Sequence, residues 1–87
     1  MIEGNKKIIF KKAEIYRIVV RGMIGKSWSP RLSNMQITSK KNSKEETFTS
    51  LVGKVNDQTA LSSVLLTLYE MHMTVISVKM LSDIVEG

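Results

Sequence analysis

Residues 57–80 read DQTALSSVLLTLYEMHMTVISVKM, and the hydrophobic period of this stretch changes partway along it. Its apolar side chains first recur every three or four positions, which predicts an amphipathic helix that ends at Met71 or His72. From Met73 to Met80 the chain is rich in β-forming residues, which predicts a strand. One face of this strand carries Ile76, Val78 and Met80. A helix that leads into a strand in this way, with more strands before it, indicates an α+β domain.

The two ends of the predicted helix carry the polar residues that attract attention as site candidates. Asp57 stands where a carboxylate accepts hydrogen bonds from the free amides of the first turn, so it is predicted as the N-cap, with Asn56 as the close alternative. His72 is the only histidine and stands at the negative end of the helix dipole. Both are therefore interpreted as structural caps.

Three strands are predicted before the helix. Residues 14–21 alternate, and one row is wholly apolar and is expected to face the core: Tyr16, Ile18 and Val20. A second short strand is predicted at 35–39, and the charged run 40–46 is predicted as an exposed hairpin connection. In the third strand, at 47–52, either row is compatible with the core, and we favour Leu51 inward.

This order of elements predicts a two-layer β-β-β-α-β domain over residues 13–81. If the first three strands form a meander, a right-handed crossover through the helix returns the fourth strand parallel to the first. The expected sheet is therefore mixed, in the order third, second, first, fourth, with the helix on one face. Residues 1–12 are predicted as a basic tail or an additional edge strand, and 82–87 as a C-terminal tail.

Composition excludes several kinds of site. The chain has 87 residues, no cysteine and a formal net charge of +5, so it has no disulfide framework, thiol nucleophile or cysteine-ligated metal. The charge is uneven: the first 44 residues hold eleven basic and two acidic side chains, and the rest hold two basic and six acidic ones. The sequence shows neither an export signal nor a membrane span, so a cytoplasmic protein is expected.

About three quarters of the chain carries a series of short motifs. The motif residues are Tyr16, Ile18, Val20 and Gly22; Ser27, Trp28 and Ser29; Met35, Ile37 and Thr38; Gly53, Val55, Asp57, Gln58, Ala60 and Leu61; and Val75, Ile76, Ser77 and Val78. In these motifs the chain resembles a group of short, stand-alone, uncharacterised bacterial α+β proteins, which implies a fold and no biochemical activity. His72 replaces the glycine that usually ends the helix in that group, which implies a left-handed C-cap.

Two surfaces of the predicted domain are candidates for binding. A single helix leaves one sheet face uncovered, which favours a homo-oligomer, formed through this face or through a sheet edge, in a small domain without disulfides. The residues expected at this self-association surface are Ile15, Val19 and Val75. The second candidate is an anion- or nucleic-acid-binding patch formed by Arg17, Arg21, Lys26, Arg31 and Trp28. Trp28 is a stacking platform in that patch, an anchor for an oligomer, or a lid on the core.

These observations favour a small, non-enzymatic interaction or structural module that self-associates. The alternative is weak, sequence-nonspecific binding of nucleic acid or another anionic ligand through the basic half of the chain. An enzyme that uses Asp57 and His72 is the least favoured class, because neither residue has a recognisable orienting partner in the sequence. No cofactor, metal or membrane partner is expected.

Overall fold

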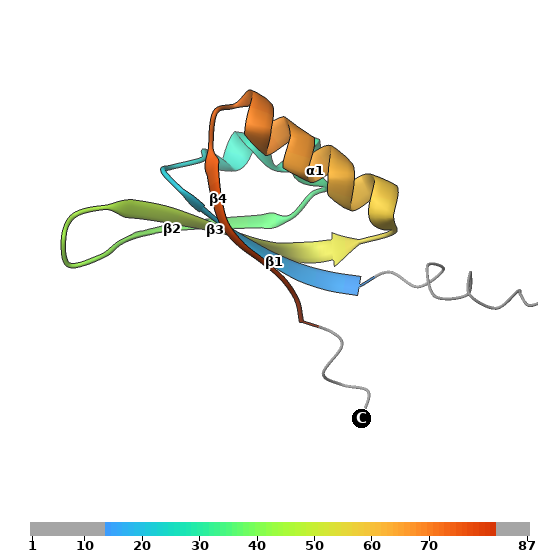
Figure 1. The fold of residues 1–87 in the computed structure, drawn as a ribbon, viewed down its shortest axis with the longest axis horizontal. Helices are drawn as coiled ribbons and strands as arrows, with labels where there is room; N and C mark the ends of the chain where they lie inside the picture. The colour runs from blue at the N-terminus through green and yellow to red at the C-terminus, as the bar shows by residue number, and fades with distance from the viewer. Residues whose placement is uncertain (1–13, 82–87) are drawn as a thin grey trace, which may run out of the picture.

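The computed structural model describes residues 14–81, which form a four-stranded sheet with a helical layer on one face (Figure 1). In chain order the elements are β1 (Glu14–Arg21), the 3-10 helix η2 (Lys26–Leu32), β2 (Gln36–Lys41), β3 (Thr47–Val55), α1 (Gln58–Glu70) and β4 (Thr74–Met80). The tail or edge strand predicted at 1–12 and the tail predicted at 82–87 lie outside the described residues. No helix in the described part is long and apolar enough to cross a membrane.

The predicted α+β class is confirmed, but the predicted strand order and the mixed sheet are wrong. The strands lie in the order β2-β3-β1-β4, and each neighbouring pair is antiparallel. The first strand does not turn back into the second, because β3 is inserted between them. Two split β-α-β units result, one through η2 and one through α1, which is the ferredoxin-like arrangement.

The segment between β1 and β2 explains the error in the predicted order. It runs over fourteen residues, 22–35, whereas hairpin loops commonly have about two to five. Although its Ser and Pro residues indicate a loop, it buries Ile24, Leu32 and Met35 in the core. The hydroxyl of Ser29 donates to the Met35 carbonyl at 2.7 Å, which closes η2 onto the start of β2. The segment is therefore a packed crossover and no hairpin loop.

The core lies between the sheet and the helical layer. Ile18 and Val20 are fully buried, as the alternation of the first strand predicts. Leu51 is fully buried as well, which confirms the prediction that it faces inward from the third strand. Val64 and Leu68 close the core from α1. Since neighbouring residues along a strand point to opposite faces, the buried residues of each strand determine which side chains lie on the other face of the sheet.

Candidate functional site

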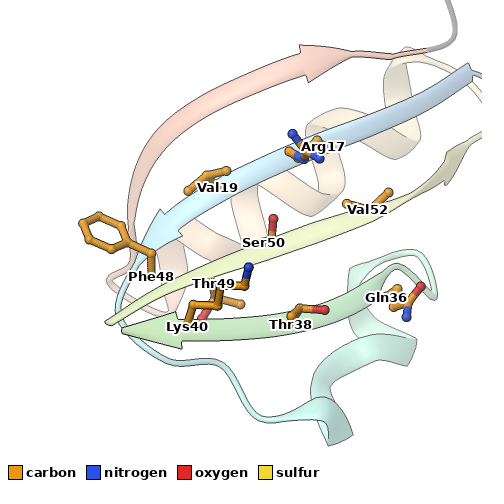
Figure 2. A pocket seen from close by; sticks show the side chains of 9 residues that line it. All are labelled: Arg17, Val19, Gln36, Thr38, Lys40, Phe48, Thr49, Ser50 and Val52. Carbon is orange, nitrogen blue, oxygen red and sulfur yellow. The ribbon is translucent and has the colours of Figure 1, made fainter. Parts of the chain in front are cut away.

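In the part of the chain that the structure describes, the sheet face opposite the helical layer is open to a partner. Both α1 and η2 lie on the other side of the sheet (Figure 1), and no described element covers this open face. Figure 2 looks onto it, with α1 behind the strands. Residues that pair across antiparallel strands share a face, so the register shows which side chains are neighbours here.

The register divides the open face into three rows that run from β2 to β4. The first row contains Lys40, Phe48, Arg21 and Thr74. The middle row contains Thr38, Ser50, Val19 and Ser77. The third row contains Gln36, Val52, Arg17 and Lys79. Beyond the third row, Ile15 lies opposite Lys54.

Charge is arranged in lines on this face. The first and third rows each hold two cationic side chains, and the middle row is neutral. At about 3.3 Å per residue, the two cationic rows lie about 13 Å apart along the strands. The described acidic residues all lie outside the three rows: Glu14, Glu45, Glu46, Asp57 and Glu70. A neutral strip with hydroxyl and small apolar side chains is therefore flanked by positive charge on both sides.

The surface is also slightly hollow. A shallow concavity of about 560 Å³ extends over β1, β2 and β3 and is lined by side chains from all three rows, among them Arg17, Val19 and Phe48 (Figure 2). At one end of it, the guanidinium carbon of Arg21 lies 5.8 Å from the centroid of the Phe48 ring. Such a cation–π pair presents a planar surface on which another flat group can stack.

The structure separates the residues of the predicted anion-binding patch. Arg17 and Arg21 lie on the open face, but Trp28 and Arg31 belong to η2 on the helix-covered side. There the guanidinium carbon of Arg31 lies 5.4 Å from the centroid of the Trp28 ring, which is half-buried and packs against the core. Lys26 lines a separate depression along the outer edge of β2.

Among the charged and aromatic side chains of the three rows, sequence reasoning missed Lys40, Phe48 and Lys79. A signal for Phe48 was present, because an inward Leu51 requires Phe48 to point outward by simple alternation. The positions of the other two depend on the strand order. Lys79 joins Arg17 only because β4 pairs antiparallel with β1.

The predicted self-association residues are also divided. Ile15 and Val19 lie on the open face, on β1. Val75 lies opposite Val20 in the register, and Val20 belongs to the helix-covered face. A bulge in β4 between the partners of Val19 and Val20 produces this change of face, and it leaves Ile76 without a partner in β1. The apolar part of the open face is therefore confined to a few residues among the cations.

Asp57 and His72 lie at opposite ends of α1 and have local roles. The Asp57 carboxylate accepts a hydrogen bond from the Ala60 amide at 2.8 Å. His72 has φ of 62°, and its amide donates to the Tyr69 carbonyl at 2.9 Å. The thirteen residues of the helix place the two about 20 Å apart, too far for direct proton transfer.

The end of α1 is a Schellman motif. In addition to the His72 bond, the Met73 amide donates to the Leu68 carbonyl at 3.0 Å, which satisfies a second free carbonyl. His72 thus occupies the left-handed position at which glycine is most common. Among the described residues, no cluster of three or more His, Cys, Asp and Glu side chains suitable for a metal ion is present.

Comparisons with known proteins add a family and no activity. Neither the curated proteins nor the solved structures contain a match to this chain. A family model described as a domain of unknown function, DUF8691, matches residues 15–79. The matched segment runs from β1 to β4 and contains every residue of the three rows of the open face. Since the match covers well over half of the sequence, the chain belongs to the DUF8691 family.

Proposed function

We propose that this protein is a non-enzymatic binding module whose open sheet face binds single-stranded nucleic acid without sequence preference. The observation that carries the proposal is the arrangement of the face: two cationic rows flank a neutral row, and no acidic side chain lies among them. Lys and Arg that neutralise phosphates supply sequence-independent affinity for nucleic acid. A proximal aromatic ring adds stacking for a base.

The rows of the open face match the phosphates and the bases of single-stranded nucleic acid. The phosphates of a bound strand contact the cations, and its bases lie over the neutral strip. In that strip the hydroxyls of Thr38, Ser50 and Ser77 offer hydrogen bonds, and Val19 offers a small apolar contact. Phe48, held against Arg21, offers its ring to a base at one end. Contacts of this kind distinguish a polynucleotide from a simple anion.

The shape of the face favours a single strand over a duplex. Four strands at a spacing of about 4.8 Å make a face about 14 Å wide before side chains are counted. The major groove of B-DNA is about 12 Å wide and admits a helix or a two-stranded ribbon. A four-stranded face is therefore too wide for the groove, whereas an extended single strand can lie across it.

A second copy of the protein is a weaker candidate for this face. Stacking two open faces brings the cationic rows of both copies together, without acidic residues in the rows to offset them. Like charges directly opposite one another are destabilising. Self-association is therefore more favourable at a part of the surface that carries less charge.

The test is the fluorescence anisotropy of a labelled oligothymidylate at low salt, titrated with the full chain. Arg21→Gln removes a cation from the open face, and Arg31→Gln removes one from η2. The two form a matched pair, because each arginine lies over an aromatic ring and the net charge changes equally. We expect Arg21→Gln to weaken binding severalfold and Arg31→Gln to leave it almost unchanged. Absence of binding, or equal losses in both variants, would overturn the proposal.

A further inference from the structure

The two edges of the sheet differ in how they are protected. β2 carries Lys40 and Lys41, and lysine on an edge strand discourages pairing with another chain. β4 carries a single charge, Lys79, and a run of apolar residues. Four of the eight large hydrophobic side chains exposed in the described residues lie on this one strand, with exposures of 38–48%: Val75, Ile76, Val78 and Met80. The β4 edge is therefore the less defended of the two.

Among the described residues no strand pairs with the outer edge of β4, so the backbone there presents free hydrogen-bonding groups. The Leu81 amide donates to the Ile15 carbonyl at 2.7 Å, so the backbone hydrogen-bonding groups of Leu81 point toward β1. In an antiparallel ladder, hydrogen-bonded and non-hydrogen-bonded positions alternate. The backbone amides and carbonyls of Lys79 and Ser77 therefore also point toward β1, whereas those of Val78 and Met80 point away from the sheet.

We propose that β4 pairs antiparallel with β4 of a second copy of this chain, across a twofold axis at Val78. In this register Val78 lies opposite its own counterpart, and Ile76 lies opposite the partner's Met80. Lys79 lies opposite the partner's Ser77, so no two charges of the same sign are directly opposed. The pairing satisfies the free groups at Val78 and Met80 and covers apolar side chains of both copies.

The pairing joins the two sheets into a single eight-stranded sheet. Because paired residues share a face, the open faces of both copies become continuous, and each copy contributes its cationic rows to one longer surface. This consequence rests on the proposed function, although the pairing itself does not. A seven-residue edge buries less than the roughly 800 Å² per partner of a standard stable interface, so the dimer is expected to dissociate on dilution.

Sedimentation of the full chain without nucleic acid tests the pairing. We expect a concentration-dependent monomer–dimer equilibrium. Val78→Lys places a charge at the twofold axis and should leave only monomer. Thr38→Lys makes the same change on the opposite edge strand and should leave the dimer intact. A monomer at every concentration, or a dimer that persists in folded Val78→Lys, would overturn the proposal.

A cysteine cross-link gives a second measurement that does not depend on a disruptive variant. The chain has no cysteine, so a single introduced thiol can form a disulfide only between two copies. Directly opposed, hydrogen-bonded residues have Cα atoms about 5.5 Å apart, which suits a disulfide. Val78→Cys should oxidise rapidly to a covalent dimer and Thr38→Cys should not, and equal rates would contradict the twofold axis. Because no nucleic acid is present, failure here leaves the proposed function untouched.

Discussion

Removing one cationic row from the open face should change the salt dependence of nucleic-acid binding by a predictable amount. Each phosphate neutralised on a single strand contributes about −0.7 to the slope of log K against log salt. The four cations of the two rows therefore predict a slope of about −2.8. With that slope, a fourfold rise in salt weakens binding about 50-fold. Arg17→Gln/Lys79→Gln removes the cations of the third row and should reduce the slope to about −1.4, so that the same rise weakens binding only about sevenfold.

The assay is the anisotropy of a labelled oligothymidylate, titrated at a series of salt concentrations. Lys26→Gln/Arg31→Gln is the control, because it removes the same net charge from η2. The control should keep the slope of the unmodified chain. If both double variants lower the slope equally, affinity follows net charge alone and the assignment to the open face is wrong. A slope that is unchanged by loss of Arg17 and Lys79 would refute the reasoning in the same way.

Three other predictions concern single residues. His72→Gly relieves a left-handed backbone at the end of α1 and should raise the free energy of unfolding by about 0.5–1 kcal/mol in urea denaturation; a loss of stability would contradict this account. Thr49 is fully buried and its hydroxyl donates to the Gly22 carbonyl at 2.6 Å, so Thr49→Val should lower stability by about 1–3 kcal/mol. Thr38→Val on the open face should change the free energy of unfolding by no more than about 0.5 kcal/mol. Equal effects of the two substitutions would show that the buried Thr49 hydroxyl is unimportant for stability. Trp28 packs on the helix-covered side, so saturation with oligothymidylate should leave its emission unchanged, and strong quenching would place the ligand at η2.

Local patterns in the sequence predicted most of the individual elements. The change of period after residue 71 indicated α1 and β4, and alternation identified the buried row of β1. Such patterns are local because they depend on which side chains one element buries. The same alternation that places Leu51 in the core also places Phe48 on the open face.

The strand order could not be obtained in this way, because it depends on contacts between distant segments. Ile24 and Leu32 lie in a stretch that its Ser and Pro residues mark as a loop, yet both are buried. Their burial turns the stretch into a crossover, and β3 then takes the place beside β1 that a meander would give to β2. The grouping of Arg17 with Lys79, and the separation of Arg21 from Trp28, both follow from that exchange.

The open face contains two valines whose methyl groups report directly on the site. Val19 and Val52 lie there, whereas Val20, Val55 and Val64 are buried in the core. Methyl resonances of the full chain, followed by NMR during titration with oligothymidylate, therefore test the proposed interface most directly. We predict shifts concentrated at Val19 and Val52, with little change in the three buried valines. Unperturbed Val19 and Val52 resonances at saturation, or shifts confined to η2, would contradict binding at the open face.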